Sequence, residues 1–147
     1  MSEISEETKP LFFQVSVGRF ILLSICTIGI YEVYWFYKNW HSIRERRQNN
    51  ISPIVRALFS PLWYAALIKE LNKEVSRAIV HESFTDADHR PSYINIWLWA
   101  PAYFILSILV NIPGPYLPLI FALTMATLLP AVSVIKRLNN PAYSKVI

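Results

Sequence analysis

Long uncharged stretches dominate the pattern of apolar and polar positions along the chain. Between Arg90 and Lys136 lie 45 residues without a charged side chain. A single helix of that length would reach roughly 68 Å, about twice the thickness of a bilayer core of about 30 Å. Three prolines and a glycine within residues 112–118 interrupt the stretch and predict a tight turn. The segment 93–135 is therefore expected to form a hairpin of two transmembrane helices.

A second apolar stretch, residues 15–37, contains only Arg19 and Glu32 as charged residues. It predicts a first transmembrane segment, interrupted near Gly29. We favour a single kinked span over a re-entrant pair of half-helices, because non-helical backbone at membrane depth needs protein or water to satisfy its amides. The aromatic residues that end the stretch predict a belt at the membrane interface: Tyr31, Tyr34, Trp35, Phe36, Tyr37 and Trp40.

The segment 57–80 has a different, amphipathic pattern. Apolar side chains recur at four-residue steps from Phe59 to Ile79, and charged and polar side chains fill the opposite face. Its uncharged part is too short to cross a bilayer. It therefore predicts a helix on the cytoplasmic membrane surface, with packing of the same stripe against the transmembrane helices as the alternative.

These segments predict an all-α integral membrane protein with about three transmembrane helices, the first kinked or re-entrant, and one amphipathic surface helix. The composition agrees, since 54% of the 147 residues are hydrophobic and only 16% charged, against about a quarter charged in soluble domains. The expected order is an N-terminal tail (1–14), a first transmembrane segment (15–37), a basic cytoplasmic loop (38–56), the interfacial helix (57–80), a polar loop (81–92), the transmembrane hairpin (93–135) and a basic tail (136–147).

The distribution of the basic residues predicts the orientation. Basic residues follow the first segment and the last, and cationic loops stay on the cytoplasmic side. The C-terminus is therefore expected in the cytoplasm. With three spans the N-terminal tail lies outside, and with a re-entrant first segment it lies inside. The residues concerned are Lys38, Arg44, Arg46, Arg47 and Arg56 after the first segment, and Lys136, Arg137 and Lys145 after the last.

Several classes of chemistry find no support in the sequence. A single cysteine excludes an intramolecular disulfide, and three glycines leave no Gly-rich phosphate loop. No pattern of nucleophile and base appears. An embedded enzyme would need a second buried ionisable residue near Glu32, and we expect none. The prediction is a protein that is not an enzyme and has no cofactor.

Glu32 is the first candidate functional residue, because a carboxylate within a transmembrane segment costs several kcal/mol unless it faces protein or water. We expect it to lie near the inner membrane face and to pair with Arg56 or Lys38. A partly desolvated ion pair would offset part of the burial cost of both groups.

Other candidates concern lipid, partners, bending and metal. The basic loop and the apolar stripe predict contacts with anionic headgroups or a protein partner, and not with nucleic acid: Arg44, Arg46, Arg47, Trp40, Trp63, Leu67 and Leu71. Gly29, Pro101 and Pro130 are the expected hinge or kink positions. The polar loop holds weak candidates for metal binding, whose spacing matches no metal motif, so no metal site is expected: His81, Asp86, Asp88 and His89.

Two segments carry a resemblance to known proteins. Residues 27–40 read T-x-G-x-Y-x-x-Y-W-F-Y-K-N-W, and residues 51–59 read I-S-P-x-x-R-A-x-F. The chain resembles small bacterial inner-membrane proteins of a family with a domain of unknown function. The resemblance covers residues 15–67 and implies a bacterial cytoplasmic membrane location, multi-pass. It also implies a shared architectural role, but no catalytic role, for Gly29, Tyr31, Glu32, Trp35, Lys38, Trp40, Ser52, Pro53 and Arg56.

The sequence thus predicts a non-enzymatic membrane subunit or scaffold that binds other membrane proteins or anionic lipid. The alternative is a homo-oligomeric channel or small transporter that uses Glu32. Three spans are too few for most alternating-access folds in one copy, so the alternative requires an oligomer.

Overall fold

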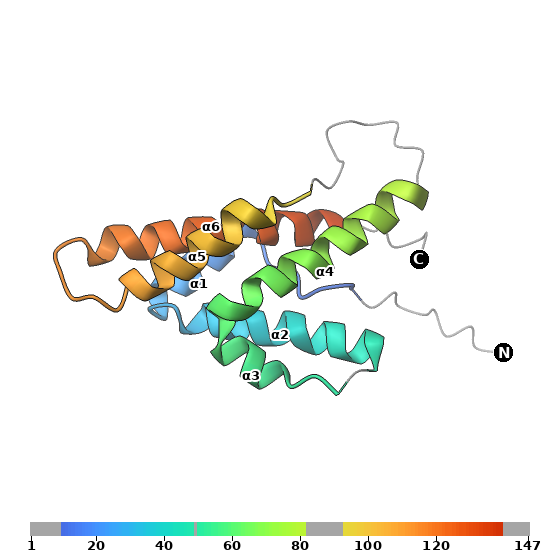
Figure 1. The fold of residues 1–147 in the computed structure, drawn as a ribbon, viewed down its shortest axis with the longest axis horizontal. Helices are drawn as coiled ribbons and strands as arrows, with labels where there is room; N and C mark the ends of the chain where they lie inside the picture. The colour runs from blue at the N-terminus through green and yellow to red at the C-terminus, as the bar shows by residue number, and fades with distance from the viewer. Residues whose placement is uncertain (1–9, 49, 82–92, 140–147) are drawn as a thin grey trace.

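The computed structural model describes residues 10–48, 50–81 and 93–139, and these fold into six helices without a strand (Figure 1). The all-α class is therefore confirmed. The helices are α1 (Val17–Cys26), α2 (Ile30–Arg47), α3 (Pro53–Leu58), α4 (Ser60–His81), α5 (Ile96–Leu109) and α6 (Leu117–Leu138).

Helices α1 and α2 fold back on each other. Phe20 on α1 packs edge-on against Trp35 on α2, with ring centroids 5.5 Å apart. Before α1, the ring of Phe12 lies 4.8 Å from the guanidinium carbon of Arg46. A single kinked span over 15–37 would carry the start of this segment away from α2. That interpretation is therefore wrong, and the backbone path agrees with the alternative of two half-helices.

The reversal between α1 and α2 is a Schellman-type ending. The Gly29 N–H donates to the Ser24 carbonyl (2.9 Å), and the Ile28 N–H donates to the Ile25 carbonyl (3.3 Å). Ile28 takes the left-handed position at φ 52°, and Gly29 follows at φ 87°. The side chain of Thr27 joins the two helices, since its Oγ1 donates to the Leu23 carbonyl and accepts from the Tyr31 N–H.

The segment predicted as a basic loop, 38–56, is largely helical. Helix α2 continues to Arg47, and the short α3 begins at Pro53, a residue whose fixed φ suits the first helical turn. The amphipathic helix starts at Ser60, three residues later than expected, and runs to residue 81.

The C-terminal helices form the expected hairpin. In Figure 1, α5 and α6 lie side by side and are joined by the proline-rich connection. Asn95 caps α5 by accepting a hydrogen bond from the Trp97 N–H (3.1 Å). Pro101 and Pro130 lie inside α5 and α6, as expected, and their role as kinks stays a prediction.

An aromatic core joins α1, α2, α4 and α5. Phe36 contacts Tyr64 and Tyr103, each with ring centroids 5.9 Å apart, and Tyr64 donates to the Thr127 carbonyl on α6 (2.7 Å). The predicted interfacial belt is therefore wrong for Trp35, Phe36 and Trp40, which are fully buried. Their side chains are covered by neighbouring helices that the local pattern does not reveal.

One helix within the described ranges, α6, is long and apolar enough to cross a membrane by length and composition. Helices α1 and α5 are apolar but have 10 and 14 residues, or roughly 15 and 21 Å of helix. Three full-length spans therefore stay a prediction.

Candidate functional site

A pocket opens at one end of the helix bundle. Its lining comes from the α1–α2 turn, the α3–α4 junction, the last turns of α5 and the first turns of α6, which gather toward the left of Figure 1. We call this part of the molecule the apolar end. The pocket has a volume of about 820 Å³, within the range of small-molecule sites. Its walls are mainly apolar and include Ile25, Ile30, Leu58 and Phe121.

Glu32 lies in the first turn of α2, lines this pocket and is only 7% exposed. The hydroxyl of Tyr103 on α5 donates to Glu32 Oε2 at 3.5 Å, and Ser60 Oγ on α4 lies 3.3 Å from the same hydroxyl. Glu32 Oε1 is buried and has no hydrogen-bond partner among the described residues. The positive end of the α2 dipole gives partial compensation for a carboxylate at this position.

The predicted ion pair of Glu32 with Arg56 or Lys38 is wrong. The Arg56 guanidinium carbon lies 4.3 Å from the ring centroids of both Trp40 and Trp63. Lys38 Nζ lies 5.7 Å from the centroid of Tyr34. Aromatic faces attract both cations and hold them away from the carboxylate.

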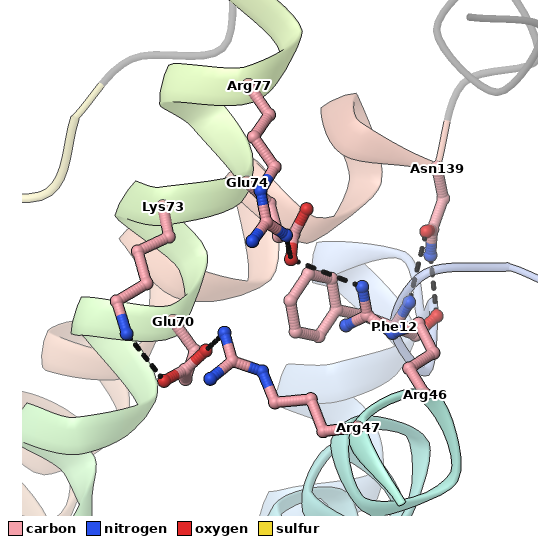
Figure 2. Close-up of polar contacts among 8 residues, drawn as sticks. All are labelled: Phe12, Arg46, Arg47, Glu70, Lys73, Glu74, Arg77 and Asn139. Carbon is pink, nitrogen blue, oxygen red and sulfur yellow. Dashed lines mark hydrogen bonds and ion pairs between the residues drawn. The ribbon is translucent and has the colours of Figure 1, made fainter. Parts of the chain in front are cut away.

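The opposite end of the bundle carries an ion-pair network between α2 and α4 (Figure 2). We call it the charged end. Glu74 Oε1 accepts from Arg46 (3.4 Å) and Arg77 (2.7 Å), and Glu70 pairs with Arg47 and with Lys73 (3.2 Å). Burial lowers the pKa of Arg46 from its usual value, and the Glu74 carboxylate opposes that shift. The side-chain amide of Asn139 bonds the N–H (3.2 Å) and carbonyl (2.6 Å) of Phe12 there.

The apolar part of the predicted contact surface is mostly internal. Trp40, Leu67 and Leu71 are fully buried, so they belong to the core and not to an exposed docking stripe. The amphipathic alternative, packing against the other helices, is the one that the structure supports. Arg46 and Arg47 are engaged with glutamates, Trp63 is half-buried under Arg56, and Arg44 remains exposed.

Gly29, a predicted hinge, stands at the wall of the pocket. Its φ of 87° favours glycine, and a Cβ built there would lie 3.3 Å from the Phe121 ring. The metal candidates Asp86, Asp88 and His89, and the side chain of His81, lie outside the described residues. Within the part that is described, no cluster of three metal-ligating side chains occurs.

Sequence reasoning missed Tyr103, Ser60 and Phe121. The expectation of no second buried ionisable group near Glu32 is corrected by Tyr103, whose hydroxyl contacts the carboxylate. A signal was present, since a tyrosine within an uncharged, apolar helix needs a partner for its hydroxyl.

Comparison with protein-family models, with curated proteins and with solved structures gave no match.

Proposed function

We propose that this protein is a small membrane-embedded subunit without catalytic activity, which inserts its apolar end into the bilayer and binds another membrane protein there. The observation that carries the proposal is the segregation of the two ends. Exposed large apolar side chains surround the three chain reversals of the apolar end, and fewer, Ile79 and Val80, are exposed beside the charged end. Those of the apolar end are Ile25, Ile28, Ile30, Leu58, Phe59, Leu62, Ile108, Ile112 and Leu117. The ion pairs between helices α2 and α4 lie at the other end.

The level of the membrane surface follows from the same segregation. Tyr93 and Trp97 are exposed near the start of α5, and the Tyr93 hydroxyl lies 3.2 Å from Ser76 Oγ, close along α4 to Glu74. Exposed tyrosine and tryptophan favour the headgroup region. The charged end would then lie at the cytoplasmic surface, where Arg44 and the last turn of α6 meet anionic lipid.

Both ends of the described chain belong on the same side in this arrangement. Phe12 and Asn139 are hydrogen-bonded, so the segments before α1 and after α6 are neighbours. We therefore propose that the N-terminal and C-terminal tails are both cytoplasmic. This replaces the external N-terminus expected for three spans.

Insertion is tested with Cys26, the only cysteine in the chain, which is exposed near the apolar end. In sealed membranes, a charged maleimide should label Cys26 only after detergent is added. A Cys26→Ser variant with cysteine in place of Arg44 should react without detergent once the cytoplasmic face is accessible. Equal labelling of both sites in intact membranes would contradict insertion of the apolar end.

Partner binding is tested with a photo-crosslinking residue at Leu62, which is 61% exposed on the first turn of α4. The expected result at native expression is one discrete adduct with a different membrane protein. The matched control is the same residue at Arg44 on the charged end. Adducts with lipid alone at Leu62 would exclude a protein partner at this face.

A homo-oligomeric channel or small transporter is the second candidate, favoured by the position of Glu32 on the pocket wall. It requires crosslinks between copies of the chain and a symmetric assembly in native-membrane extracts. Flux or conductance should then fall in Glu32→Gln.

A further inference from the structure

We propose that the pocket at the apolar end binds a primary ammonium group carried on an apolar body, with the carboxylate of Glu32 as its counter-ion. This ligand class goes beyond the subunit role and does not depend on it. The proposal rests on three features of the pocket: a carboxylate with spare acceptor capacity, apolar walls, and polar neighbours whose hydrogen bonds are already made.

The carboxylate of Glu32 has unused capacity. An ionised carboxylate offers about four lone-pair positions, and the described residues supply one long hydrogen bond, from Tyr103 at 3.5 Å to Oε2. Oε1 is buried without a partner. No ion pair within the described residues includes Glu32, although Arg46 and Arg77 converge on Glu74, the other glutamate buried in the described part of the chain.

The side chains that line the pocket favour a ligand whose body is apolar. Ile25, Ile30, Leu58 and Phe121 line the pocket, and its volume of about 820 Å³ is large enough for an alkyl chain or a compact ring system. A cation with a polar or highly charged body would leave unpaired groups against these side chains. A monovalent ammonium with an apolar body satisfies both the carboxylate and the walls.

Three further polar residues of the lining, Ser107, Asn111 and Thr124, are hydrogen-bonded to carbonyls of α5 or α6. The Ser107 hydroxyl donates to the Tyr103 carbonyl (2.6 Å), and the Thr124 hydroxyl donates to the Ile120 carbonyl (2.8 Å). The Asn111 amide donates to the Ser107 carbonyl (2.7 Å). Each of them thus uses one donor in these bonds and keeps an oxygen that can accept, which suits a ligand that donates hydrogen bonds.

The test uses the full chain in phosphatidylcholine nanodiscs, with n-octylammonium as the probe and n-octanol and n-octanoate as matched probes of the same length. A ligand that binds the folded state raises the thermal midpoint in proportion to the logarithm of its concentration above Kd. We expect a rise of this logarithmic form with octylammonium and none with the alcohol or the carboxylate. Equal shifts with octylammonium and octanol would overturn the proposal.

Substitution of glutamates tests whether the response to octylammonium depends on the pocket. Glu32→Gln should lose the response to octylammonium, whereas Glu45→Gln, on the same helix but exposed at the charged end, should keep it. If Glu32→Gln does not fold, a photoreactive alkylammonium on the wild-type protein replaces it. Adducts on the peptides around Leu58 and Phe121, displaced by octylammonium and not by octanol, support the site. Adducts spread over all helices overturn it.

Two kinds of ligand carry such an ammonium group: a free amine and an aminolipid with the group in its headgroup. Nanodiscs that contain phosphatidylethanolamine distinguish them. If this lipid raises the midpoint of the wild-type protein but not of Glu32→Gln, and abolishes the octylammonium response, the source is the lipid. If only octylammonium acts, the source is a free amine. The absence of a Glu32-dependent response to both would refute the ammonium site.

Discussion

Two glutamates buried at opposite ends of the bundle have contrasting surroundings. Glu74 at the charged end is 4% exposed and contacts two arginines, one on its own helix and one on α2. Glu32 at the apolar end is 7% exposed and contacts a tyrosine hydroxyl. Similar burial thus accompanies full charge compensation in one case and almost none in the other.

The difference separates a structural group from a group available for binding. Desolvation of a carboxylate is costly, and two guanidinium groups offset that cost for Glu74 within the fold itself. Glu32 has only a hydroxyl and the start of a helix to offset the same cost. We therefore expect the charged end to contribute mainly to stability, and we propose that the apolar end carries the binding function.

The largest expected effect comes from exchanging each glutamate for glutamine. Glu74→Gln leaves Arg46 and Arg77 without a counter-charge. Breaking a buried pair costs 3–5 kcal/mol, and because these arginine side chains are 32% and 58% exposed, we expect about 2 kcal/mol. Glu32→Gln should change stability by less than about 1 kcal/mol, since the amide still accepts from Tyr103.

Thermal unfolding of both variants in one detergent measures this contrast. A loss of stability in Glu32→Gln as large as that in Glu74→Gln would show that both carboxylates are structural.

The next effect concerns the turn at the apolar end. Gly29→Ala should cost about 1–2 kcal/mol, because alanine disfavours a positive φ and its Cβ meets Phe121. Gly18→Ala is the control, since no atom lies within 4 Å of its Cβ position. In the first turn of α1, that change should stabilise, by at most the roughly 0.5–1 kcal/mol of a mid-helix position. The two thermal midpoints should therefore move in opposite directions, and a fall in both would contradict the turn geometry.

Local patterns in the sequence predicted α4 and the C-terminal hairpin, but not the division of residues 15–56 into α1, α2 and α3. The four-residue apolar period located α4, and the uncharged stretch with its prolines located the α5–α6 hairpin, because both signals are local. The all-helical class followed from them.

The pairing between elements was not predictable in this way. The sequence predicted the apolar face of α4. It did not predict that other helices cover Leu67 and Leu71 on that face. Tyr103 lies 71 residues from Glu32, and no spacing rule connects them. The α1–α2 reversal was foreseen only as the less favoured alternative of two half-helices, and a signal for its geometry was missing because Ile28, a β-branched residue, occupies the left-handed position that glycine normally takes.

A smaller expected effect tests the hydrogen bond between Tyr103 and Glu32. Tyr103→Phe removes the hydroxyl that donates to Oε2, and we expect a loss of about 1 kcal/mol. In the background of Glu32→Leu the same change should cost clearly less, because the acceptor is gone. The double-mutant cycle, measured by thermal unfolding, isolates the coupling between the two side chains. Equal costs in both backgrounds would mean that Ser60, and not Glu32, is the energetically important partner of Tyr103.

The smallest expected effect is a gain in stability at Ile28, which is 84% exposed and lies at φ 52°. Ile28→Gly relieves left-handed strain of about 1–2 kcal/mol, and the greater freedom of glycine in the unfolded chain removes part of that gain. A net stabilisation of about 0.5 kcal/mol should remain. Ile28→Ala keeps a Cβ at the same φ and should give no comparable gain. If alanine stabilises as much as glycine, the gain comes from removing an exposed apolar side chain. Backbone strain at Ile28 would then contribute nothing measurable to the free energy of unfolding.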